Sequence, residues 1–469
     1  MNSILVIDGG GRGNAIAHRL TTSPAVEDVY VTPGNAGVYE YGGENRPLPD
    51  GTKRERIPAV IEHVEAEDVD LAVPGSEGWL SAGIVDAFHE ETDVPVLGPT
   101  RRAATLESSK CDTKDYLDDI GVPVPTYRNF DDAAAAKDWA REWYDERDAD
   151  LVPKADGIAA GKGAFVCDSL EETLTAIETI TGDAFNEEYD GAGERLEIEE
   201  RLRGEELSFF AITDGETVRP FGTARDYKRR YANPDGALID QYFDGINPNT
   251  GGMGAYSPHD LGEDIEDRIM TEIADPTVAN LDMDYTGILH FVLMVVEEPD
   301  GLQPYVLEIN VRDGDPEAQA RLPRLETDLF EVYHAAATGS LADVDVEWRD
   351  DYCVGVCAVS GPPYKDGERV GAGYPGTYLS KQPIFPRGRP DERIGREGVG
   401  EYVEGTVYHN GTDLHENTEG TPFLRSRGGR VLTFTTTGET LEAAREQAYE
   451  DLDEVFFSFM AYRDDIGEE

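Results

Sequence analysis

The sequence predicts an α/β protein with an N-terminal open parallel sheet, a central α+β region and a C-terminal β-rich domain. Its 469 residues are enough for about three domains. Residues 1–100 alternate strand and helix patterns, the order that is typical of an open parallel sheet. Strand patterns predominate from residue 196 onward. We expect three domains, at residues 1–100, 101–343 and 344–469.

The individual elements are predicted from apolar runs and their periodicity. In the first domain we expect strands at 4–8, 28–32, 71–74 and 94–97, and helices at 14–22, 54–66 and 80–91. In the central region we expect helical stretches at 101–120 and 263–280, a long polar loop at 229–254, and strands at 149–153, 164–167, 196–200, 206–213, 217–223, 287–296 and 303–310. A helix at 440–453 is expected near the end of the β-rich domain.

Composition narrows the classes of partner. The chain carries 96 acidic and 41 basic residues, a formal net charge of −55, and only nine of the bases are lysine. A dispersed acidic surface that uses arginine in place of lysine predicts a protein from a salt-adapted organism, although an ordinary acidic protein is the alternative. The charge disfavours nucleic acid and anionic membranes as partners. With neither a long apolar span nor a basic leader at its N-terminus, the chain is expected to be cytoplasmic.

Residues 154–163 read Lys-Ala-Asp-Gly-Ile-Ala-Ala-Gly-Lys-Gly and form the most informative motif. Lys154 and Lys162 bracket a glycine-rich stretch between two expected strands, which suits a triphosphate because glycines let backbone N–H groups approach its oxygens. The stretch is not a Walker A loop, since the GxxxxGK[ST] pattern is missing. A glycine-rich hairpin with incidental lysines is the alternative.

Two further motifs favour phosphate and metal chemistry. The turn 9–13 lies between a strand and a helix, where backbone N–H groups suit a phosphate, although it could be no more than a tight turn. Glu308 and Asn310 end an expected strand and lie on one face of it, as two oxygen ligands for Mg²⁺ would. Arg312 follows, placed to bind a carboxylate or a transferring phosphoryl group. Taken alone, an E-x-N pattern is equally an acidic strand end.

Two regions suggest nucleotide and substrate contacts. Backbone groups around Glu200 and Leu202 could read an adenine edge, and Glu206 could accept from ribose hydroxyls, although these acids could also form a solvated face. The glycine-rich loop 247–254 could close over a ligand. The cations at 228–230, unusual in so acidic a chain, suggest an anionic substrate or else a surface salt-bridge patch.

In their order along the chain, the lysine loop, the adenine strand and the E-x-N strand resemble the ATP-grasp superfamily. More narrowly, the chain resembles the phosphoribosylamine–glycine ligases nearly from end to end. The stretches that carry this resemblance are 10–12, 33–37, 98–100, 107–110, 154–163, 248–258, 285–287, 308–319 and 428–432. The resemblance implies an ATP-grasp domain at 101–343, with the lysine loop in a subdomain at 123–195, and a monomer.

The resemblance also implies a reaction and its residues. ATP, glycine and 5-phosphoribosylamine would give glycinamide ribonucleotide, ADP and phosphate through glycyl phosphate, with Mg²⁺ or Mn²⁺ as the metal. By motif position, ATP would contact Lys110, Lys154, Gly161, Lys162, Gly163, Glu199, Glu200, Leu202 and Glu206. The metal would bind Glu308 and Asn310. The catalytic set would be Arg312, Asp315 and Lys162, and the substrates would contact Gly11, Asn35, Lys228, Arg312 and Asp315.

The sequence departs from the family pattern at several places. Gly13 stands where a glutamate is usual, the loop 74–79 keeps its glutamate without the usual prolines, and Asp313 replaces a phenylalanine. The loops 231–246 and 360–405 are longer than usual. Since the first two departures touch the expected sugar pocket, the alternative is a diverged ATP-grasp enzyme that joins a different carboxylate and amine. A non-catalytic nucleotide-binding protein would have little reason to retain Lys154, Glu308 and Arg312 together.

Overall fold

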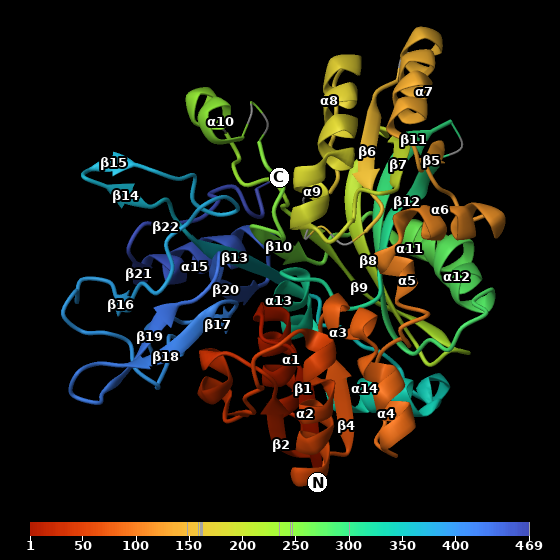
Figure 1. Cartoon of the computed structure of the whole chain (residues 1–469). Coiled ribbons are helices and arrows are strands. Elements are labelled where there is room, and N and C mark those ends of the chain that lie inside the picture. The colour runs from red at the N-terminus through yellow and green to blue at the C-terminus, as the bar shows by residue number, and fades with distance from the viewer. Residues whose placement is uncertain are drawn as a thin grey trace.

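The computed structural model describes residues 1–147, 149–157, 159, 163–233, 235–243, 245, 247–299 and 301–468. Within these residues a four-stranded, a three-stranded and a nine-stranded sheet form the framework, and three two-stranded ribbons are attached to it. Figure 1 shows the N-terminal domain at the bottom, the three-stranded sheet with its helices at the upper right, and the C-terminal region on the left.

The N-terminal sheet is parallel, as predicted. Its strand order is β3 (Glu44–Asn45), β2 (Val26–Val31), β1 (Asn2–Ile7), β4 (Leu71–Pro74). The surrounding helices are α1 (Gly11–Thr21), α2 (Lys53–Ala66), α3 (Glu77–Ala82) and α4 (Ile84–Glu91). Strand β1 is central and apolar, with Ile4 to Ile7 all at 0% exposure, which is expected for a parallel strand covered on both faces.

Two predictions for this domain are wrong in detail. The single helix expected at 80–91 is two helices, because Gly83 has a φ of 93°, a left-handed conformation that ends α3. The strand expected at 94–97 contributes, in the described structure, one isolated parallel bridge between Val96 and Ala72.

The first part of the central region is built on a small antiparallel sheet. Its order is β5 (Tyr127–Phe130), β7 (Leu196–Glu200), β6 (Leu151–Ala155). The helices of this part are α5 (Thr105–Ser108), α6 (Lys110–Asp119), α7 (Ala133–Glu146), α8 (Leu170–Thr181) and α9 (Asp183–Glu188). The strand expected at 164–167 is, among the residues described there, an isolated bridge from Ala164 to Lys154.

The large sheet joins the central and C-terminal regions. Its order is β12 (Gly301–Asn310), β11 (Gly287–Glu298), β8 (Glu205–Thr213), β9 (Val218–Asp226), β10 (Gly254–Ser257), β13 (Tyr352–Ser360), β20 (Arg430–Gly438), β17 (Thr406–His409), with β22 (Met460–Ala461) beside β13. All pairings in it are antiparallel. The C-terminal β-rich region therefore continues the central sheet through the β10–β13 pairing.

The remaining elements cover this sheet or extend from it. The helices are α10 (Gly236–Phe243), α11 (Glu263–Ile269), the π turn η2 (Met270–Ala274), α12 (Asp275–Ala279), α13 (Glu317–Arg321), α14 (Leu329–Thr338) and α15 (Leu441–Asp453). Short 3₁₀ turns are η1 (Ala36–Tyr41), η3 (Leu322–Arg324), η4 (Leu341–Asp343) and η5 (Gly400–Tyr402). The ribbons pair β14 (Tyr364–Lys365) with β15 (Glu368–Arg369), β16 (Ile384–Pro386) with β21 (Val455–Phe457), and β18 (Thr412–Glu416) with β19 (Pro422–Ser426). Helix α10 lies inside the expected polar loop, so that prediction is wrong in part.

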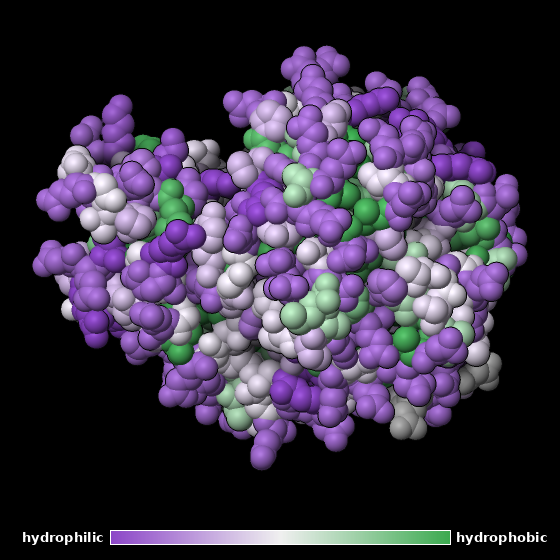
Figure 2. Space-filling view, turned by 90° about the horizontal axis from the view of Figure 1, so that it is seen from below, coloured by the Kyte–Doolittle hydropathy of each residue, from purple (hydrophilic) through white to green (hydrophobic). Residues whose placement is uncertain are grey.

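The face in Figure 2 is mostly polar, with small apolar areas that are separated from one another. Among the residues with a described structure, no helix has both the length and the apolar character needed to cross a bilayer.

Candidate active site

Glu308, near the end of β12, is surrounded by cations. Burial raises the pKa of its carboxyl, but Lys110, Lys228, Lys154 and, more weakly, Arg312 outweigh this effect and lower the pKa. These four cations come from segments far apart in the sequence. An ionised carboxylate is therefore held at the point where the small sheet, the large sheet and the loop 311–316 meet.

Asn310 lies on the same face of β12 as Glu308. Its Oδ1 accepts a hydrogen bond from Arg312 Nη2 at 2.8 Å. Two oxygen-bearing side chains on one strand face fit a Mg²⁺ ion that takes its other ligands from phosphates and water. In the described part of the chain, no group of three His, Cys, Asp or Glu side chains forms a complete protein cage for a metal.

Lys154 on β6 is buried and connects the two sheets. Its Nζ lies 2.5 Å from Glu199 Oε1 and donates to the carbonyl oxygen of Leu307 on β12 at 3.0 Å. Lys114 on α6 lies against the other oxygen of Glu199, at 2.9 Å. Burial raises the pKa of Glu199, but the two lysines outweigh it and lower the pKa. The side chain predicted to face the nucleotide is thus held by two ammonium groups.

Glu197, two residues earlier on β7, points to the same side, and the motifs gave no reason to select it. Its Oε1 is 3.7 Å from the Nζ of both Lys114 and Lys154. Burial raises the pKa of Glu197 to about 7, against the attraction of the two lysines. The period-two spacing of 197 and 199 in a strand was the available signal.

The lysine loop is described at both ends. Lys110, at the start of α6, donates from Nζ to the carbonyl oxygen of Gly157 at 3.5 Å, and Gly163 accepts from Ala155 N at 2.8 Å. The predicted contacts Gly161 and Lys162 lie outside the described residues. A narrow cavity beside this loop is lined in part by Lys110, Lys114, Glu197 and Glu308.

Glu206, the predicted ribose contact, lies beside Lys228, the predicted sugar-phosphate contact. Lys228 Nζ lies 2.5 Å from Glu206 Oε1, so these two side chains form an ion pair in this structure. Glu200 ends β7 and its N–H donates to Thr126 O at 2.8 Å. Leu202 follows in the connection to β8.

Arg312 is the centre of a second charged group. Its Nη2 is 2.8 Å from Glu107 Oε1 and its Nε is 3.6 Å from Glu77 Oε2, while Arg12 reaches the same Glu77 oxygen at 3.7 Å. Burial raises the pKa of Glu107 to about 7. At Glu77 the two arginines outweigh burial and lower the pKa to about 2. Neither glutamate was among the predicted site residues.

Asp315 lies where the three regions of the chain meet. Gln319 Nε2 donates to its Oδ1 at 2.6 Å, and Arg430 of β20 lies 3.1 Å from its Oδ2. Gly11 is close by, because a Cβ there would stand 2.4 Å from Gln319 Nε2. A Cβ there would also stand 2.2 Å from Asn410 Oδ1, so a larger residue at this position would displace two amide side chains.

Asn35, a predicted substrate contact, makes hydrogen bonds within the protein. Its Nδ2 donates to His409 O at 2.5 Å, and its Oδ1 accepts from Gly37 N at 3.0 Å. The side chain therefore joins the N-terminal domain to β17. We infer that it shapes the turn beside Gly11 through the main chain.

Three buried titratable groups near the loop 311–316 were also missed. Burial raises the pKa of Asp226 and of Glu317, and it lowers the pKa of His290, which favours the uncharged form of each. His290 Nε2 is 3.6 Å from Glu317 Oε1. Shifted pKa values of this kind, grouped beside a charged loop, are typical of functional sites.

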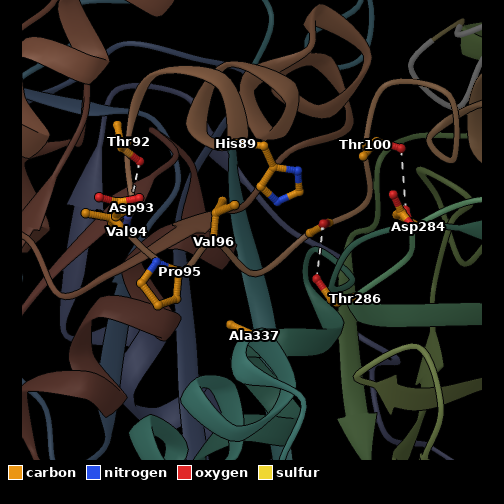
Figure 3. A pocket seen from close by; sticks show the side chains of 11 residues that line it. His89, Thr92, Asp93, Val94, Pro95, Val96, Thr100, Asp284, Thr286 and Ala337 are labelled. Atoms are coloured by element: carbon orange, nitrogen blue, oxygen red, sulfur yellow. Dashed lines mark hydrogen bonds between the residues drawn. The ribbon is translucent and has the colours of Figure 1, made fainter.

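A larger cavity lies elsewhere. It measures about 410 Å³ and is lined by residues of α4, of 92–100 and of the segment before β11, with Thr100 and Thr286 bonded across it to Asp284 O and Gly98 O (Figure 3). None of the predicted site residues lines it. The charged site above is therefore the better candidate.

A small antiparallel sheet that faces a larger one, with a buried lysine bridging them beside an E-x-N strand, defines an ATP-grasp protein. Family models agree. The phosphoribosylglycinamide synthetase N domain matches residues 2–107, its ATP-grasp (A) domain residues 108–318 and its C domain residues 369–469. The chain belongs to the phosphoribosylglycinamide synthetase family.

Individual proteins support this assignment. A phosphoribosylamine–glycine ligase of Archaeoglobus fulgidus is 43% identical over 489 residues, covering 99% of this chain and 98% of that protein. The Vibrio cholerae ligase is 37% identical, with 99% and 97% covered. The crystal structure of the Thermotoga maritima ligase matches with a TM-score of 0.72 at 27% identity, covering 99% of this chain and all of that one.

Proposed function

We propose that this chain ligates glycine to 5-phosphoribosylamine with ATP, giving glycinamide ribonucleotide, ADP and phosphate in purine biosynthesis. The reaction is inferred from membership of the phosphoribosylglycinamide synthetase family. The structural observation that supports it is the ionised Glu308 among Lys110, Lys154, Lys228 and Arg312. Such a site can hold a metal–triphosphate at one end and a carboxylate at the other.

The nucleotide end is proposed to use the lysines. Lys110, Lys154 and Lys162 would neutralise the phosphates, with backbone groups of Gly161 and Gly163 beside them. The adenine and ribose would contact the segment that contains Glu199, Glu200, Leu202 and Glu206. Because its carboxylate is held by Lys114 and Lys154, Glu199 would act by aiming Lys154.

Glu308 and Asn310 are proposed to hold Mg²⁺ or Mn²⁺, which would neutralise charge on the β- and γ-phosphates. Arg312 donates to Asn310 and so is already oriented toward this point. Arg312 would hold the glycine carboxylate as that group attacks the γ-phosphate. ADP then leaves and glycyl phosphate forms.

In the second step the amine of the sugar attacks the acyl carbon, and phosphate leaves. The attacking amine must lose a proton. Asp226 and Glu317 are proposed acceptors in their ionised forms, which bind a proton more strongly because burial has raised their pKa values. Asp315 would face the substrates, together with Gly11 and the turn that Asn35 holds. Lys228 would leave its ion pair with Glu206 and bind the sugar phosphate instead.

Several finer features belong to the same proposal. The net charge of −55 supports adaptation to high salt. We propose a cytoplasmic monomer with domains at 1–100, 101–343 and 344–469. Because the departures at Gly13 and 74–79 lie at the expected sugar end, a different carboxylate–amine pair is the second candidate.

The test is phosphate release from ATP by the purified protein at high salt. Release that requires both glycine and phosphoribosylamine, with equimolar glycinamide ribonucleotide, is expected. Release with another carboxylate–amine pair and not with this one would favour the second candidate. Absence of release with every pair tried would contradict a ligase.

A further inference from the structure

A buried ion pair lies directly behind the loop 311–316. Arg321 Nη2 of α13 donates to both carboxylate oxygens of Asp313, at 2.6 Å each. The side chains of Arg321 and Asp313 are 0% and 1% exposed. Asp313 stands where the family pattern usually has a phenylalanine, so its ion pair with Arg321 is a feature that the family pattern does not explain.

The guanidinium of Arg321 is fixed by the large sheet. Its Cζ lies 4.2 Å from the Phe210 ring centroid and 4.6 Å from that of Phe221, and Nη1 donates to Phe221 O. Gly222, with a φ of 86°, leaves room, since a Cβ there would stand 3.0 Å from Arg321 Cδ. A planar guanidinium held by two aromatic rings and a carbonyl keeps one orientation.

The fixed carboxylate in turn fixes a peptide group. Asp313 Oδ1 accepts from Gly314 N at 2.8 Å. The carbonyl oxygen of Asp313 accepts from Arg12 Nη1 at 2.7 Å and from Arg312 Nη1 at 3.2 Å. One carbonyl therefore orients an arginine of the N-terminal domain and the arginine of the loop.

We propose that Asp313 and Arg321 are positioning residues of the ligase site, which set the direction of Arg312 without touching substrate. Stability alone does not account for the pair, because replacing a buried ion pair by apolar residues is often neutral or stabilising. Its distinctive contribution is a defined geometry, which a reaction that depends on positioning requires. The inference rests on the proposed ligase function.

The test compares single and double variants in the full-length protein. Asp313→Asn leaves Arg321 buried without a counter-charge, so we expect a lower melting temperature. Asp313→Leu with Arg321→Met removes both charges, and we expect it to regain most of that stability. A positioning role predicts that kcat of the double variant stays at least about tenfold below wild type, with the KM for ATP within about twofold.

Two further variants complete the design. Arg321→Lys keeps the charge but cannot contact Asp313 and Phe221 O through two separate nitrogens, and we expect a tenfold or larger fall in kcat even where the double variant does not fold. Asp413→Asn breaks the bidentate pair with Arg425 in the β18–β19 ribbon, which is away from the site, and should leave kcat unchanged.

The possible outcomes distinguish a failure of the positioning role from a failure of the proposed ligase function. Wild-type kcat in a folded double variant, or in Arg321→Lys, would overturn the positioning role while the ligase stands. A wild-type protein that releases no phosphate would remove the proposed function and this inference with it.

Discussion

The two ends of the candidate site hold their charges differently. At one end, Lys114, Lys154 and Lys228 each contact a carboxylate through a single ammonium group, at 2.5 to 2.9 Å. At the other end, Arg312, Arg321 and Arg430 each contact different oxygens through two nitrogens of a planar guanidinium.

This difference has a physical meaning. A lysine ammonium is a compact charge on a flexible stem, and it can turn toward arriving phosphates with little loss of geometry. An arginine fork fixes both position and angle. The chain has only nine lysines, and three of them, Lys114, Lys154 and Lys228, lie at one end. We infer that this end neutralises charge, while the arginine end orients the reacting groups.

The largest expected effect comes from replacing a fork by a point charge. Arg312→Lys keeps the charge, but a single ammonium cannot replace both Nη2, which contacts Asn310 and Glu107, and Nη1, which donates to Asp313 O, so kcat should fall by about 10²–10³. Steady-state kinetics with glycine as the varied substrate measure it. Arg425→Lys is the same change in the β18–β19 ribbon and should retain the wild-type kcat. If both variants had the same kinetics, the proposed difference between the two ends of the site would be wrong.

The next largest effect concerns the metal. Glu308→Gln removes an ionised carboxylate that the surrounding cations stabilise, and the activity should fall about 10- to 100-fold at low Mg²⁺ and recover in part at high Mg²⁺. A Mg²⁺ titration of the rate measures the shift. Glu297→Gln, at the exposed end of β11, is the control. An unchanged titration for Glu308→Gln would place the metal elsewhere.

Much of the fold could be predicted because it rests on local patterns. The strands at 71–74 and 196–200 have the predicted bounds, since each is a short run with clear alternation or burial. The strands predicted at 94–97 and 164–167 form isolated bridges in the described structure, because strand formation there depends on a neighbour that local sequence does not specify.

The site could be predicted only where a motif carries it. Glu308, Asn310 and Arg312 follow one another along the chain, and the structure brings them together. Lys114 contacts Glu199 across 85 positions, so that no local pattern relates them. The pairing of Lys228 with Glu206 was missed for the same reason, because it depends on how β8 and β9 are placed in the sheet.

The smallest expected effect is a pH dependence of stability that Glu197, beside the lysines, would cause. Glu197 has a folded-state pKa of about 7 against an ordinary value of 4.5, so the native state binds its proton more tightly than the unfolded chain does. The stability that this carboxyl contributes is complete below about pH 4.5 and is lost as the pH rises through 7. Glu197→Gln cannot ionise, and it should therefore be more stable than wild type at pH 8, by about 1–3 kcal/mol.

Urea unfolding of both proteins from pH 5 to pH 8 measures this difference. The free-energy gap between Glu197→Gln and wild type should widen with pH, because only the wild type must bury an ionised carboxylate beside Glu199. Glu194→Gln, an exposed change just before β7, should give a gap that does not vary. If Glu197→Gln were instead less stable at pH 8, the carboxylate would be a needed partner of Lys114 and Lys154, and the lysine end would be as rigidly paired as the arginine end.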